Sequence, residues 1–140
     1  MVIDSFRGQY FFLSNFCEVP VIYDGITYLN NEVAFQAQKT INKEERIDFS
    51  MLNPSQAKRM GRRVSLRPDW EEVKFDIMYE ICKAKFTQNQ SYKENLLKTG
   101  DAELIEGNDW GDKIWGQVDG IGENHLGKIL MRIREELKNE

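Results

Sequence analysis

The sequence PDWEEVKFDIMYEICKAKF, residues 68–86, places apolar side chains at every third or fourth position. This period matches the 3.6 residues per turn of an α-helix that buries one face. Pro68 suits the first turn of such a helix, so we predict a helix from Pro68 to about Phe86. The residues that form its buried face are Trp70, Val73, Ile77, Met78, Ile81 and Cys82.

Shorter helices are predicted on both sides of this segment. Asn30 and Asn31 offer N-caps for one of them, and Pro54 occupies the first turn of another. Gly100 is typical of a residue that follows a helix C-terminus. The predicted ranges are about 31–41, 54–64, 91–98 and 124–137.

Strands are a minor part of the prediction. Residues 19–29, VPVIYDGITYL, place two β-favouring runs around Asp24-Gly25, which is a strong signal for a hairpin. A further strand is predicted at 102–105, followed by a loop rich in Gly, Trp and Asp up to Gly122. We therefore predict a mainly α fold with a minor α+β character, in one domain over residues 1–140.

Composition limits the classes of function. The chain has 140 residues, a formal net charge of −4 and no apolar run of the roughly 20 residues that cross a bilayer. Two distant cysteines and no signal peptide predict a reduced cytoplasmic protein without membrane contact. His125 is the only histidine, which excludes a His-rich zinc site, and we favour a structural role for it.

The segment EVAFQAQK, residues 32–39, gathers polar side chains on one helical stripe. Glu32, Phe35, Gln36 and Lys39 are spaced by three, four and seven residues and therefore share a face. An acid, an amide, an amine and an aromatic ring on one stripe can grip a polar ligand. The spacing alone also fits a simpler alternative, a solvent-exposed face with an ordinary ion pair.

Two basic residues, Lys85 and Arg62, are further candidates for ligand binding. Lys85 lies four residues after Ile81, on the apolar face of the 68–86 helix, where its amine must reach solvent, pair or line a pocket. The cluster AKRMGRR at 57–63 includes Arg62, which either binds a phosphate or complements the dipole at a helix C-terminus.

The loop NDWGDKIWG, residues 108–116, holds two tryptophans, two aspartates and two glycines. Trp stacks on a flat base, Asp binds sugar hydroxyls or exchanges protons, and Gly lets the backbone approach a ligand. The simpler alternative is that one of the tryptophans fills the core.

Taken in order, these segments resemble the NADAR (YbiA-like) family. The matching motifs cover nearly the whole chain, and the ordered set is far more specific than any one of them. Two departures lie beside the expected pocket: Val33, where many relatives have His, and a short loop between Trp115 and Gly122. The motifs are Phe6–Tyr10, Leu13–Phe16, Glu32, Phe35–Lys39, Ala57-Lys58, Gly61-Arg62, Arg67–Trp70, Lys85-Phe86, Thr99–Asp101, Leu104–Glu106, Asp112-x-x-Trp115-Gly116 and Gly122-x-Asn124-x-Leu126–Lys128-x-Leu130-Met131.

This resemblance implies a helical YbiA-like fold with a small β element and an enzyme that hydrolyses a C–N glycosidic bond. The activities known in the family include hydrolysis of phosphorylated ribosylamino-pyrimidine intermediates of riboflavin biosynthesis, which we expect here. The alternative is removal of ADP-ribose from guanine in nucleic acid. A rival of another class is a non-catalytic module that binds ADP-ribose or a nucleotide, which has no need of a carboxylate at the sugar.

Cleavage of such a bond builds positive charge on C1 of the sugar and negative charge on the leaving base. We expect Glu32 to stabilise the sugar or activate water, and Asp112 to bind ribose hydroxyls or relay a proton. Lys39 and Lys85 are the other catalytic candidates: they pair with Glu32, bind phosphate or capture an opened sugar as a Schiff base. The expected substrate-binding residues are Arg7, Ser14, Asn15, Phe35, Gln36, Arg62, Trp115 and Asn124.

No cofactor and no metal are expected, because nothing fixes a coordination geometry among Asp109, Asp112 and Asp119. The expected partner is a small phosphorylated ribosyl substrate, with nucleic acid only as an ADP-ribosylated substrate. The oligomeric state is left open by the sequence.

Overall fold

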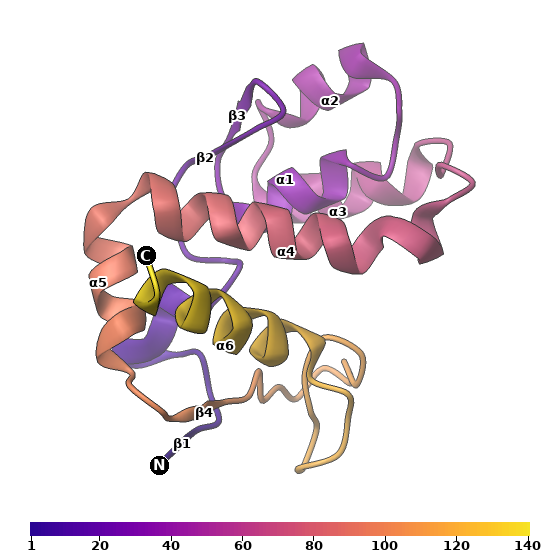
Figure 1. Ribbon diagram of the computed structural model, residues 1–140. Coiled ribbons are helices and arrows are strands. Elements are labelled where there is room, and N and C mark those ends of the chain that lie inside the picture. The colour runs from indigo at the N-terminus through magenta and orange to yellow at the C-terminus, as the bar shows by residue number, and fades with distance from the viewer. The chain divides into compact units, whose positions relative to one another are not determined.

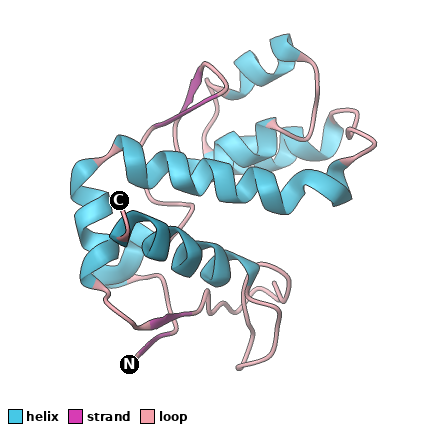
Figure 2. Ribbon diagram, in the orientation of Figure 1, coloured by secondary structure: helices cyan, strands magenta, loops and turns pink.

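The structure, a computed structural model, describes residues 1–140. Contacts group the chain into two compact units, Asn15–Gln88 and the combination of Met1–Ser14 with Asn89–Glu140. Helices dominate both units and the sheets are small, which confirms the mainly α fold (Figure 2). No helix has the length and apolar character needed to cross a membrane. One domain over residues 1–140 stays a prediction.

Four helices build the Asn15–Gln88 unit (Figure 1): α1 (Asn31–Ala37), α2 (Lys43–Phe49), α3 (Pro54–Arg63) and α4 (Trp70–Gln88). The short helix α1 packs against the three others. All seven residues of α1 are buried, so its polar side chains do not form a solvated surface.

Asparagine side chains begin three of these helices. Asn30, Asn42 and Asn53 each accept a hydrogen bond from a backbone N–H three residues further on, at 2.9 to 3.1 Å. These N-caps satisfy donors that a helix leaves unpaired in its first turn. Pro54 takes the first position of α3, as predicted.

The predicted helix at 31–41 is wrong at its C-terminal end, because α1 ends at Ala37. The Gln38 side chain donates from Nε2 to the Ala34 carbonyl at 3.1 Å, and the Lys39 carbonyl accepts from the Arg67 N–H at 2.8 Å. Both bonds tie the residues that follow Ala37 to partners outside a regular helical pattern. The helix α2 was not predicted, since its sequence KEERIDF lacks an apolar stripe.

The predicted hairpin is confirmed. Strands β2 (Val21–Tyr23) and β3 (Ile26–Tyr28) pair antiparallel, with Tyr23 opposite Ile26. Asp24 and Gly25 between them have φ values of 51° and 80°, the conformation that a two-residue type I′ turn requires. Strand β2 packs against α4.

The other unit consists of a 3₁₀ helix η1 (Gly8–Leu13), helices α5 (Gln90–Lys98) and α6 (His125–Lys138), and a two-stranded sheet. In that sheet β1 (Val2–Ile3) runs parallel to β4 (Glu103–Leu104), with Ile3 opposite Leu104. Strand β4 is one residue shorter at each end than the predicted 102–105. Helix α6 packs against α5 and β4.

The start of α6 is fixed by Asn124, which has a left-handed backbone with φ 54°. Its amide Nδ2 donates to the Leu104 carbonyl at 2.9 Å, and its Oδ1 accepts from the Glu106 N–H at 3.0 Å. A Cβ on Gly127 would collide with the same Leu104 carbonyl, so this glycine permits the close approach of α6 to β4.

Candidate active site

Glu32 lies in the first turn of α1 and is only 8% exposed. Its Oε1 accepts a hydrogen bond from Gln36 Nε2 at 3.0 Å, one helical turn further on. A buried carboxylate costs free energy unless polar groups compensate it. The stripe at 32–39 is therefore a buried polar stripe, and the solvent-exposed alternative for it is wrong.

The helix α3 packs closely beneath this hydrogen bond. A Cβ on Gly61 would collide with Gln36 Oε1, and it would stand 3.6 Å from Lys39 Cδ. Because Gly61 has no side chain, it leaves the Gln36 amide the room that it occupies when it donates to Glu32.

Gly61→Ala is expected to destabilise the fold by about 1 to 3 kcal/mol, because the added methyl displaces Gln36 or α3. Alanine normally stabilises a helix interior over glycine by about 1 kcal/mol, so the predicted sign is reversed. Urea unfolding measures the change. The pair Arg59→Ala and Arg59→Gly, at an exposed position of α3, supplies the control, and a more stable Gly61→Ala protein would contradict the packing described.

Lys39 follows α1 and belongs to a cluster of charges. Burial lowers the pKa of its amine, the nearby Glu32 carboxylate raises it, and the positive charges of Arg62 and Lys58 lower it further. Lys39, with the nearby Arg62 and Lys58, thus brings positive charge close to the Glu32 carboxylate. Such a positive local field suits a phosphate group even though the whole chain is acidic.

Aromatic rings surround this cluster. Phe35 and Trp70 are in tilted contact with their ring centroids 5.0 Å apart, and Lys39 Nζ lies 6.0 Å from the Trp70 ring. Lys58 Nζ lies 4.6 Å from the Phe16 ring. Trp70 and Lys58 were not predicted as site residues. Periodicity explained Trp70 as core, and Lys58 was one basic residue among several.

Lys85 on α4 is 1% exposed, so the alternative in which its amine reaches solvent is wrong. Burial lowers the pKa of this amine to about 8, and the thiols of Cys82 and Cys17 oppose this shift. An amine with this pKa is partly neutral near physiological pH. Such an amine is available as a nucleophile.

Asn15 is buried and supports the start of α1. Its Oδ1 accepts from Asn31 Nδ2 at 3.1 Å, its Nδ2 donates to Met78 Sδ at 3.4 Å, and its carbonyl accepts from the Glu32 N–H at 3.1 Å. The preceding residue, Ser14, is half-buried. Asn15 therefore orients the helix turn that carries Glu32.

In the other unit, Asp112 organises the Trp-rich loop. Its Oδ1 accepts from the N–H of Ile114 at 3.1 Å and from the N–H of Trp115 at 2.9 Å, which makes a turn closed by a carboxylate. Trp115 is half-buried with its ring 6.4 Å from that of His125, and Trp110 is exposed. Neither tryptophan is a fully buried core residue.

Glu106 is a carboxyl group that was not predicted as a site residue. Burial raises its pKa to about 7, a hydrogen bond from Asn108 opposes this shift, Asp112 adds to it and Arg7 opposes it. Asn108 Nδ2 donates to Glu106 Oε2 at 2.9 Å. Glu106 appeared only as one letter of a motif, because nothing in the local sequence reveals that its carboxyl is enclosed.

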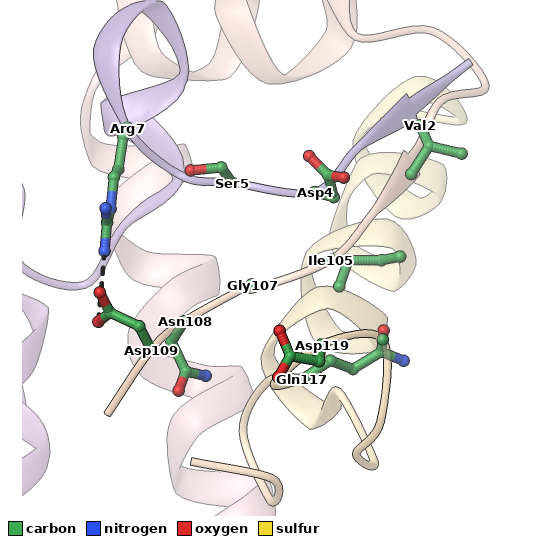
Figure 3. A pocket seen from close by; sticks show the side chains of 11 residues that line it. Val2, Asp4, Ser5, Arg7, Ile105, Gly107, Asn108, Asp109, Gln117 and Asp119 are labelled. Carbon is green, nitrogen blue, oxygen red and sulfur yellow. Dashed lines mark ion pairs between the residues drawn. The ribbon is translucent and has the colours of Figure 1, made fainter. Parts of the chain in front are cut away.

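Arg7 is exposed and lines a cavity of about 390 Å³ (Figure 3). Its Nη2 lies 3.8 Å from Asp109 Oδ1, at one end of the cavity, and Asp4 and Asp119 also line it. The structure thus gives Arg7 an acidic partner. Arg62 is also exposed, and its positive charge acts on Lys39.

The predicted residues fall into two groups. Within the Asn15–Gln88 unit, the structure brings Glu32, Phe35, Gln36 and Lys39 together, with Arg62 acting electrostatically on Lys39. Within the other unit, Asp112 and Trp115 share one turn.

Comparison with known proteins places this sequence among characterised relatives. The NADAR domain family matches residues 5–138. The N-glycosidase YbiA of Escherichia coli is 39% identical over 97% of this chain and 87% of its own length. A riboflavin biosynthesis protein of Vibrio vulnificus is 36% identical over 91% of this chain and 35% of its own length.

Solved structures agree with this assignment. The NMR structure of the Escherichia coli protein YbiA matches with a TM-score of 0.87 at 36% identity, over 99% of this chain and 84% of that chain. Because both sequence and fold are shared over nearly all of its length, this chain belongs to the NADAR family and is an N-glycosidase.

Proposed function

We propose that this enzyme hydrolyses the C–N bond between a phosphorylated ribose and a pyrimidine, in a ribosylamino-pyrimidine intermediate of riboflavin biosynthesis. The observation that carries the proposal is the buried Glu32 carboxylate, held by Gln36 and set among the positive charges around Lys39. The name of the Vibrio vulnificus relative supports the choice of pathway.

Glu32 acts on the sugar. As the bond to the base breaks, positive charge develops at C1, and a fixed carboxylate in a desolvated place stabilises that charge or activates the attacking water. The bond from Gln36 fixes the carboxylate before the reaction, so no reorganisation is needed as the charge develops. Asn15 contributes by orienting the same helix turn.

Positively charged side chains are assigned to bind the phosphate of the substrate. The positive charges of Arg62 and Lys58 act on Lys39, and a bound phosphate relieves their repulsion of its amine. Arg7, with its Asp109 partner, is a weaker candidate for this role. The remaining lysine, Lys85, is assigned to the ring-opened sugar: its neutral amine displaces the pyrimidine amine from C1 to form a Schiff base, and water then hydrolyses this Schiff base, releasing ribose 5-phosphate and restoring the lysine. The lowered pKa of Lys85 supports this role.

The leaving base is assigned to the Asp112 turn. Trp115 offers a half-buried indole on which a pyrimidine ring can stack, and Asp112 sets the backbone that carries this indole. Asn124 supports this part of its own unit by fixing residues 104–106. Ser14 and Phe35 remain proposed substrate-binding residues, each within its own unit. Neither Cys17 nor Cys82 is part of a disulfide, which fits the reducing cytoplasm in which this reaction is proposed to occur.

The substrate is tested by presenting two candidates to the same protein. We expect release of the pyrimidine and ribose 5-phosphate from the small substrate at least about 100-fold faster, by kcat/KM, than release of ADP-ribose from guanine in DNA. Chromatography of the products measures both. A reversed ratio would overturn the proposed substrate, and ADP-ribose binding with no base released from either candidate would favour a binding module.

A further inference from the structure

Glu106 is a half-buried carboxyl group to which the mechanism assigns no task. It follows β4, and its backbone is tied on both sides: its N–H donates to Asn124 Oδ1 at 3.0 Å and its carbonyl accepts from the Gln117 N–H at 2.9 Å. A Cβ on Gly116 would collide with both the carbonyl and the carboxyl oxygen of Glu106. The carboxyl therefore lies directly against the backbone that follows Trp115.

A chain of hydrogen bonds leads from this carboxyl to the backbone N–H of Trp115. Asn108 Nδ2 donates to Glu106 Oε2 at 2.9 Å and to the Asp112 carbonyl at 2.8 Å, while Asn108 Oδ1 accepts from the Asp112 N–H at 3.0 Å. Asp112 Oδ1 in turn accepts from the Trp115 N–H at 2.9 Å. Every polar atom of the Asn108 amide is used, so the amide cannot shift without moving the turn.

We propose that Glu106 is a positioning residue of the N-glycosidase, whose carboxyl holds the Asn108 amide and thereby sets the turn that carries Asp112 and Trp115. The inference rests on the proposed function, in which that turn meets the leaving base. Glu106 touches no reacting atom in this account and acts through Asn108.

The position of this turn should therefore depend on pH. Burial raises the pKa of Glu106 to about 7, the Asp112 carboxylate raises it further, and both Asn108 and Arg7 counter this effect. Above that pH the carboxylate pulls harder on Asn108 and repels Asp112, whereas below it the neutral carboxyl does neither. The charged and polar groups that act on Glu106 are thus Asn108, Asp112 and Arg7.

The position of the turn is tested without reference to catalysis. NMR spectra of the free protein follow the backbone amides of Ile114 and Trp115 against pH. We expect both to shift with an inflection near pH 7 in the native protein, and we expect Glu106→Gln to abolish the inflection. Because His125 lies next to Trp115, His125→Asn is the control, and it should leave the Glu106-dependent inflection in place. Persistence of the inflection in Glu106→Gln would overturn the inference.

Kinetics then separate a positioning role from a merely structural one. Glu106→Gln keeps an oxygen for Asn108 but cannot ionise, so the pH profile of kcat should flatten around neutral pH. Glu106→Ala removes the acceptor and should lower kcat by about 10- to 100-fold. An unchanged profile in Glu106→Gln with lost stability alone would show a structural role. If the amides titrate as expected but neither substrate is cleaved, the proposed function fails while the positioning role stands.

Discussion

Glu32→Gln is expected to lower kcat by about 1,000-fold or more while the protein stays folded. Glutamine has the shape of glutamate and keeps an oxygen that can accept from Gln36 Nε2. The charge that opposes the positive C1 is lost, whereas the packing of α1 is kept. Substrate affinity should change far less than kcat, because the lost interaction develops only in the transition state.

The matched control for this variant is Glu44→Gln, the same change at an exposed first-turn position of α2. We expect the control to keep kcat within about two-fold of the native value, since exposed surface substitutions are generally mild. Steady-state rates, with thermal unfolding to verify the fold, make the comparison. Near-native turnover in Glu32→Gln would remove Glu32 from the mechanism.

Lys85→Met is expected to raise stability and lower activity at the same time. Methionine fills a similar volume without a charge, and the burial that lowers the pKa of Lys85 from 10.5 to about 8 is a cost of the folded state. By linkage the removed cost is at most about 3 kcal/mol. Loss of the amine should reduce kcat by at least about 100-fold if it captures the sugar.

The pH dependence of the gain has a defined sign. Below about pH 8 the folded protein carries the full penalty of a buried charged amine. Between about 8 and 10.5 the folded state has released a proton that the unfolded chain still holds, so native stability rises with pH there. The advantage of Lys85→Met should therefore be largest below pH 8 and vanish towards pH 10.5.

Urea unfolding at several pH values tests this, with Lys83→Met, at a half-exposed position of the same helix, as the control. We expect the control to change stability by less than about 0.5 kcal/mol at every pH. A Lys85→Met protein with full activity and raised stability would mean that the buried amine is not catalytic. Lower stability at every pH would contradict the assigned cost of burial.

The elements that the sequence predicted are those with local signals. Apolar periodicity predicted α4, asparagine caps predicted the start of α1, a proline predicted the start of α3, and Asp24-Gly25 predicted the hairpin. Lys85 stood out because it interrupted a periodic face. In each case the deciding interaction joins residues close in sequence, within the reach of local reasoning.

Non-local interactions decided the rest. The pairing of β1 with β4 joins the start of the chain to residues near 103, and no local pattern announces it. Gly116 returns beside the Glu106 carboxyl, and Arg67 binds the Lys39 carbonyl just after α1, both from distant parts of the sequence. The local sequence around a charged or polar residue is the same whether or not a distant segment buries that residue.

The central claim is that water replaces the base at C1 of a phosphorylated ribose, with Glu32 stabilising the step. Hydrolysis of the ribosylamino-pyrimidine in isotopically labelled water, followed by mass spectrometry of both products, measures this directly. The account predicts an unlabelled pyrimidine, because water attacks C1 of the sugar and not the base, and near loss of both products in Glu32→Gln. A labelled pyrimidine, or equal yields from the native and Glu32→Gln proteins, would contradict it.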